Sequence, residues 1–254
     1  MNHAILVGIN AYPFPNVLHG CLDDVSDISK ELQSQYQFSP TEIITITDAE
    51  ATASKIKASL SAAVAKLKSG DKFILWYSGH GAQLTEGDIG TDVICPVDFD
   101  FTPETSVTVD DFHNIFSKIP NGVVAAWGSD SCHSGDLEKD FYRLGAPKQF
   151  YSARPQKPVK TVRSFKDVSS ALPNISLVAG CQSSQTSADA YINDRYNGAF
   201  TYFFLEQLRS PGGVTEPLQK LVAQTTTALH DAGYTQSPQL TGHADSIGKA
   251  FLHN

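Results

Sequence analysis

The stretch Phe73-Ile74-Leu75-Trp76-Tyr77-Ser78-Gly79-His80-Gly81 decides the fold, because an apolar, strand-like run ends there in a glycine-flanked turn that carries an imidazole. A second stretch has the same plan: residues 123–127 are apolar, and the turn Asp130-Ser131-Cys132-His133-Ser134-Gly135 follows them with a thiol. Ligands bind at the carboxyl ends of strands in an open parallel sheet, so a His and a Cys that each follow a strand can meet in one cleft. Such a pair is the arrangement of a cysteine nucleophile and its base.

Apolar runs that alternate with helical patterns indicate the fold class. Residues 3–9, 43–47 and 175–179 have the character of three further strands, and residues 238–241 give a weaker signal for a sixth. Apolar side chains at helical spacing predict helices within residues 24–36, 56–67, 200–208 and 218–229. Because the first five strands are apolar on both sides, the sequence predicts an α/β fold with a mostly parallel central sheet of about six or more strands, flanked by helices on both faces.

Length and composition exclude several classes of protein. The 254 residues are 41% hydrophobic and 18% charged, which suits one domain over residues 1–254 with a substantial core. No run of about 18 apolar residues predicts a membrane span. The net charge of −8 argues against nucleic acid as a partner. The four cysteines are far apart and no signal segment precedes them, so we expect a reduced, cytoplasmic setting.

Residues 139–172 form a basic segment within this acidic chain. The segment has three prolines, loses its periodicity, and carries eight Lys or Arg residues against Asp140 and Asp167. We expect a mobile linker between a part that holds the catalytic candidates (1–138) and a smaller part (173–254). A solvated loop that only neutralises the acidic body is the alternative interpretation.

Cys132 and His80 are the preferred nucleophile and base. A polar, glycine-containing stretch follows Cys132, which favours an exposed thiol over a buried structural one. His133 is a poor base for its neighbour, because adjacent side chains of an extended chain point to opposite sides. Neither Ser78 nor Ser134 lies in a Gly-x-Ser-x-Gly frame, and no paired ligand spacing supports zinc.

Four motifs in order resemble those of metacaspases, the caspase-like peptidases of bacteria, plants, fungi and protists. They are the segments 20–25 (GCLDDV), 77–81 (YSGHG), 130–135 (DSCHSG) and 180–189 (GCQSSQTSAD). The resemblance covers about residues 3–208 and implies a caspase-type fold, a Cys/His dyad and cleavage after Arg or Lys. It also implies that the backbone N–H groups of Gly81 and Cys132 form the oxyanion hole.

Charge supports the same substrate preference. Asp130 lies two residues before Cys132, and Asp24 follows the first strand, so both carboxylates belong to the same edge of the sheet. Two carboxylates there would bind a guanidinium or an ammonium through charge-assisted hydrogen bonds. The resemblance adds Cys21 and Ser78 to this pocket. A role for Asp24 only as a helix N-terminal charge remains open.

A second acidic set predicts a calcium site. Asp92, Asp110 and Asp111 match in order the aspartates that bind calcium in many metacaspases, and oxygen ligands suit Ca²⁺. The fourth ligand is Asp140 after a one-residue shift, with Asp136 as the other choice. Surface solvation is the competing interpretation. No organic cofactor is expected.

The sequence thus predicts a monomeric cysteine endopeptidase that cuts peptides or proteins after Arg or Lys. We expect calcium to stimulate it and the basic segment to be a site of self-cleavage. A catalytically silent module that binds basic peptides in the same cleft is the alternative, and a hydrolase restricted to one partner protein is a third interpretation. One departure concerns the segment Trp127-Gly128-Ser129, which interrupts the apolar strand before Asp130.

Overall fold

The computed structural model describes residues 1–13, 17–131, 160–182, 185 and 187–253. Its centre is a six-stranded sheet in the order β12-β9-β7-β3-β1-β2. All neighbouring strands are parallel except β12, which runs antiparallel to β9. The strands of this sheet are β1 (His3–Gly8), β2 (Ile43–Thr47), β3 (Lys72–Ser78), β7 (Val124–Asp130), β9 (Ile175–Ala179) and β12 (Gln239–Gly242).

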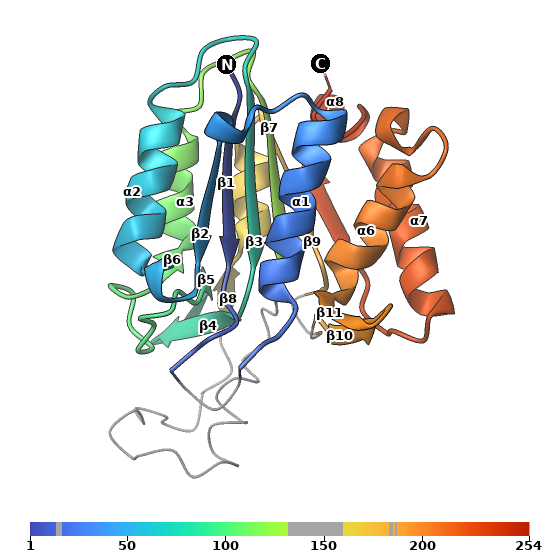
Figure 1. Cartoon of the computed structure of the whole chain (residues 1–254). Coiled ribbons are helices and arrows are strands. Elements are labelled where there is room, and N and C mark those ends of the chain that lie inside the picture. Colours follow the sequence, from blue (N-terminus) through green and yellow to red (C-terminus); the bar gives the residue numbers. More distant parts are fainter. Residues whose placement is uncertain (14–16, 132–159, 183–184, 186, 254) are drawn as a thin grey trace.

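Helices cover both faces of the sheet, so the predicted fold class is confirmed (Figure 1). One face carries α1, α6 and α7, and the other carries α2, α3 and α5. The helices are α1 (Cys21–Gln35), α2 (Ala53–Val64), α3 (Val109–Phe116), α5 (Phe165–Ala171), α6 (Ala199–Arg209), α7 (Leu218–Asp231) and a short α8 (Ala244–Ile247).

The alternation of side chains along each strand divides the core in two. On β3, Phe73 and Leu75 pack with α2 and α3, whereas Ile74 and Trp76 pack with α1 and α6. Successive residues of a strand point to opposite faces, so a central strand covered on both sides must be apolar throughout. The edge strand β2 departs from this pattern, because Ile44 is 44% exposed. The expectation that all five strands are covered on both sides is therefore wrong for β2.

The sequence did not predict the two small sheets. One comprises β4 (Gly81–Glu86), β5 (Ile89–Ile94), β6 (Val107–Thr108) and β8 (Thr161–Arg163). The other is a hairpin of β10 (Asp189–Ile192) and β11 (Arg195–Gly198). Asn193 and Asp194 form its turn with φ of 52° and 62°. Positive φ at both central residues is typical of a tight type I′ hairpin turn.

The end of the basic segment is ordered, contrary to the expectation of a mobile linker up to residue 172. Residues 161–163 form β8 beside β5, and α5 follows. Lys160 forms an ion pair with Asp88, and Arg163 forms one with Asp110. Residues 139–159 lie outside the described residues.

Gly128 lets β7 continue through the segment that interrupts its apolar run. Trp76 of β3 stands opposite Gly128, and a Cβ added there would lie 2.2 Å from Trp76 Cε3. Trp76 itself is fully buried and stacks on Phe200 of α6. The absence of a side chain at position 128 is thus what makes room for a large indole, and the strand extends to Asp130.

We predict that Gly128→Ala destabilises the protein, because the new methyl group would overlap with the buried Trp76 ring. Overpacking of this kind costs roughly 1 to 3 kcal/mol. Urea denaturation measures the loss. Gly248→Ala is the control, since Gly248 has helical angles and an added Cβ would approach no atom closer than 3.2 Å. Equal stability of the two variants would contradict the packing account.

Candidate active site

The candidate site lies at the carboxyl ends of β3 and β7, which are neighbours in the sheet. Ser78 pairs with Asp130, and the backbone N–H of Gly79 donates to the carbonyl of Asp130 at 3.3 Å. The two turns that follow these strands therefore begin side by side, as the sequence predicts. His80 lies in the first turn. Cys132 and His133 lie outside the described residues.

His80 is 9% exposed and is held through its backbone. Its N–H donates to the hydroxyl of Tyr12 at 2.8 Å, and its carbonyl accepts from the hydroxyl of Tyr77 at 2.6 Å. The N–H of Cys95 donates to the same carbonyl at 2.9 Å. Gly81 directly follows His80 and is the buried first residue of β4.

Asp24 and Asp130 meet in one buried pocket, which confirms that they share an edge of the sheet. Asp24 is 1% exposed and Asp130 is 5% exposed. A Cβ added to Gly198 would lie 2.2 Å from Asp130 Oδ2 and 2.6 Å from Asp24 Oδ2. Oxygens of the two carboxylates therefore lie close together on the same side of Gly198, at the place that a side chain of residue 198 would fill.

Hydrogen bonds fix both carboxylates. Asp24 accepts from Ser78 Oγ at 2.6 Å and from the N–H of Gly198 at 2.9 Å. Asp130 accepts from the N–H and the hydroxyl of Thr201 at 2.9 and 2.7 Å, and from the hydroxyl of Ser187. Sequence analysis missed Gly198, Thr201 and Ser187 as pocket residues, because they lie 57 to 174 positions away from the acid that each contacts.

The other acidic residues on the same side of α1 have cationic partners. Asp27 pairs with Arg195, and Glu31 pairs with Arg209 at 2.7 Å. Within the described residues, neither Asp24 nor Asp130 forms an ion pair with a Lys or an Arg. Of Asp24, Asp27 and Glu31, Asp24 is therefore the one without a cationic partner among the described residues.

Burial raises the pKa of Asp24 well above its usual value, and the nearby charge of Asp130 raises it further. Burial also raises the pKa of Asp130, although the hydrogen bonds from Ser187 and Thr201 oppose this effect. Cys21 is buried next to them. Burial and the charge of Asp24 raise the pKa of its thiol, while a hydrogen bond with Ser78 lowers it. Cys21 is thus a buried neutral neighbour of the pocket.

Asp189 and Gln236 fix the segments on either side of this pocket. Asp189 accepts from the N–H groups of His19 and Gly20 at 2.8 and 2.9 Å, just before α1 begins. Gln236 is 2% exposed and bonds to the carbonyl of Gly180 and the N–H of Ala188. No pattern in the sequence singled out Gln236.

The three described calcium candidates bond to Arg, Lys or Gln side chains. Asp110 binds Arg163, and Asp111 accepts from the N–H of the N-cap residue Thr108 and pairs with Lys57 at 2.9 Å. Asp92 is buried on β5 and accepts from Gln83 at 3.2 Å. In the described part of the chain, no three His, Cys, Asp or Glu side chains gather closely enough to hold a metal ion. Asp136 and Asp140 lie outside that part, so the calcium site stays a prediction.

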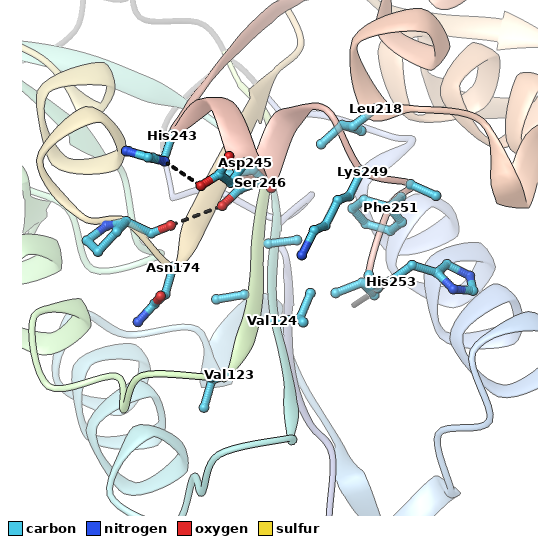
Figure 2. Close-up of a pocket in the computed structure, with 17 residues that line it drawn as sticks. Val123, Val124, Asn174, Leu218, His243, Asp245, Ser246, Lys249, Phe251 and His253 are labelled. Carbon is cyan, nitrogen blue, oxygen red and sulfur yellow. Dashed lines mark hydrogen bonds and ion pairs between the residues drawn. The ribbon is translucent and has the colours of Figure 1, made fainter.

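A cavity of about 330 Å³ lies at the opposite edge of the sheet (Figure 2). The amino end of β7 and the last turns of the chain line it, with Val124, Asn174 and Phe251 among its residues. It contains none of the candidate site residues.

Comparisons with known proteins indicate one family. The family model described as "Caspase domain" matches residues 1–246. "Metacaspase-9" of Arabidopsis thaliana is 27% identical over 98% of this chain and 96% of its own length. "Metacaspase-1" of Scheffersomyces stipitis is 27% identical over 98% of this chain and 72% of its own.

Solved structures show the same fold. Protein GSU0716 from Geobacter sulfurreducens superposes with a TM-score of 0.70 at 21% identity, over 98% of this chain and 97% of its own. Caspase-1 from Spodoptera frugiperda superposes with a TM-score of 0.63 at 14% identity, over 95% of this chain and 86% of its own.

No helix among the described residues is long and apolar enough to cross a membrane.

We predict that Asp92→Asn stabilises the protein at neutral pH. Burial raises the pKa of Asp92 to about 6, so the folded state holds this proton more tightly than the unfolded chain does. The parent therefore loses stability as the pH rises from about 4 to about 6, by at most about 3 kcal/mol. The variant has an amide that does not titrate, so it does not lose stability in this way as the pH rises.

Urea denaturation from pH 4 to pH 7 tests this prediction. The stability difference between variant and parent should be small near pH 4 and largest above pH 6. Asp194→Asn, in the exposed hairpin turn, controls for the loss of one negative charge. A difference independent of pH would contradict the assignment to Asp92.

Proposed function

Because the chain belongs to the caspase-domain family of cysteine peptidases, we propose that it cleaves peptide bonds that follow an Arg or a Lys. The observation that carries this proposal is the pair of carboxylates, Asp24 and Asp130, that lie close together beside Gly198. They lie next to the turn that holds His80, because Ser78 bonds to Asp24 and Gly79 bonds to Asp130.

The chemistry of the pocket favours a cation over other side chains. A guanidinium or an ammonium can form charge-assisted hydrogen bonds with both carboxylates. A substrate Asp would bring a third carboxylate to the same place, and like charges in an interface oppose binding. Burial without a nearby cation makes the ionised form of a carboxyl group unfavourable, and this raises the pKa values of Asp24 and Asp130. A bound cation removes this cost.

We assign the chemical steps as follows. The thiolate of Cys132 attacks the scissile carbonyl, and His80 protonates the departing amine. The backbone N–H of Gly81 is one donor to the oxyanion by resemblance, and the N–H of Cys132 is the other. Water then hydrolyses the acyl-enzyme.

We predict that the protein hydrolyses peptide reporters that end in Arg or Lys and leaves Asp reporters intact. Cys132→Ala should abolish turnover, because no other nucleophile takes part. Asp24→Asn should lower kcat/KM for Arg reporters by a factor that corresponds to roughly 2 to 5 kcal/mol, the usual loss when one partner of a buried charge pair is removed.

Asp23→Asn is the matched control, since Asp23 is the adjacent acid in the first turn of α1. It should leave kcat/KM nearly unchanged. Cleavage after Asp at a rate comparable to Arg would refute the pocket assignment. Binding of Arg peptides without turnover by the parent would instead indicate a silent peptide-binding module.

We further propose that the enzyme cuts its own basic segment, and we predict where. Lys160, Arg163 and Lys166 bond to Asp88, Asp110 and Gln239, and β8 is paired with β5. A protease needs an extended, accessible backbone, so the cut should follow one of the basic residues between 139 and 157. Mass spectrometry of the fragments locates it.

The Cys132→Ala protein is the control for self-cleavage and should stay whole. A cut after one of the residues 160–166, or equal nicking of the inactive variant, would contradict the prediction.

We also propose that calcium stimulates the activity. Support comes from Asp92, a buried acid of raised pKa that forms no ion pair within the described residues. For calcium to bind Asp110 and Asp111 as well, Arg163 and Lys57 must give up these carboxylates. We predict that a chelator lowers the rate and that Asp92→Asn removes the response to calcium. Unchanged rates with excess chelator, with no calcium bound in calorimetry, would overturn this proposal.

A further inference from the structure

Two buried tyrosines hold the backbone of His80 from both sides. Tyr12 lies in the loop after β1 and is 5% exposed, and Tyr77 lies on β3 and is fully buried. The hydroxyl of Tyr12 accepts the N–H of His80 at 2.8 Å, and the hydroxyl of Tyr77 donates to the carbonyl of His80 at 2.6 Å. The two hydroxyls are 3.2 Å apart. Both peptide groups that flank the imidazole-bearing Cα are thus fixed.

The protons of this cluster can be assigned. Each phenol has one proton, and the shortest contact uses that of Tyr77 for the carbonyl of His80. The hydroxyl of Tyr12 donates to the carbonyl of Cys95 at 3.0 Å and accepts the N–H of His80. Burial raises the pKa of both phenols well above the usual value, so both keep these protons. Tyr12 therefore acts as an acceptor towards His80 and as a donor towards Cys95.

The ring of Tyr12 also restricts the imidazole. The centroids of the two rings are 4.6 Å apart at an interplanar angle of 49°. Gly79 is required at the preceding position, because an added Cβ would lie 2.6 Å from the hydroxyl of Tyr12 and 2.7 Å from that of Tyr77. The glycine allows the two phenols to reach the backbone, and the phenol ring then limits the positions that the imidazole can take.

We propose that Tyr12 is a positioning residue for His80: it holds the imidazole in the orientation needed for proton transfer with Cys132. This inference rests on the proposed peptidase function. General acid–base catalysis depends on hydrogen-bond geometry, and a displacement of about 1 Å can cost about 100-fold in rate. Loss of the hydroxyl of Tyr12 removes the acceptor of the 2.8 Å bond from the N–H of His80, and with it one of the contacts that hold the turn.

The first test compares Tyr12→Phe with Tyr36→Phe on a peptide that the parent cleaves. Tyr36 is a matched control, since it is 2% exposed and its buried hydroxyl has no hydrogen-bond partner among the residues that the structure describes. For Tyr12→Phe we expect kcat about 10-fold to 100-fold below the parent, with KM changed less than about twofold. Tyr36→Phe should match the parent in both constants. A folded Tyr12→Phe protein with the kcat of the parent, or an equal loss in Tyr36→Phe, overturns the inference.

The second test follows alkylation of Cys132 by iodoacetamide as a function of pH, with mass spectrometry to identify the labelled thiol. Cys21, Cys95 and Cys181 are buried and should react slowly. A thiolate beside an imidazolium forms below the pKa of about 8.5 of a free thiol. We expect the midpoint of alkylation to rise towards that value in Tyr12→Phe and to stay unchanged in Tyr36→Phe. A loss of kcat without a change in this midpoint also overturns the inference, because the fault would then lie outside the His80–thiol geometry.

Two other outcomes of these experiments can also be interpreted. If Tyr12→Phe does not fold, Tyr77→Phe is judged by the same criteria, since the carbonyl of His80 keeps the N–H of Cys95. If the parent cleaves neither Arg nor Lys peptides, the proposed specificity has failed, and the alkylation profiles still decide the role of Tyr12.

Discussion

Three consecutive residues at the end of β3 are each bonded to a different part of the chain, and the geometry of the site depends on these bonds. Ser78 bonds to Asp24 of α1, Gly79 to the backbone of Asp130 on β7, and His80 to Tyr12 in the loop after β1. A parallel sheet brings the ends of its strands to one edge but does not fix the turns beyond them. Here hydrogen bonds to three parts of the chain fix the turn, so the same turn holds both the pair of acids and the imidazole of His80.

The pocket is built by segments that are distant in sequence. β11 delivers Gly198 beside the two carboxylates, and α6 begins directly after it, so that Thr201 reaches Asp130. A side chain at position 198 would collide with both acids. Asp24 also lies in the first turn of α1, where a negative charge is favourable. Its contribution to the helix and its place in the pocket are therefore compatible.

Sequence patterns predicted the central sheet because burial on both faces requires long apolar runs, as on β3 and β9. They also placed Asp24, Asp130 and His80 at one edge, since each follows or ends a strand and the carboxyl ends of parallel strands lie at the same edge of a sheet. The small sheets were missed because β6 has two residues and β10 and β11 carry polar side chains such as Asn197. The role of Tyr12 could not be predicted, because an aromatic residue in a loop has no periodicity to interpret. Only the fold shows that its hydroxyl meets the backbone of a residue 68 positions away.

The raised pKa values of Asp24 and Asp130 have a consequence for substrate capture. A raised pKa means that burial favours the protonated form of these two carboxyl groups over the ionised form. Under the specificity proposed above, a guanidinium that enters would compete with protons for the same two carboxylates. Proton release accompanies binding, and by thermodynamic linkage the affinity falls as the medium becomes more acidic. Under the proposed specificity, the burial that favours a bound cation would thus also make its binding sensitive to the acidity of the medium.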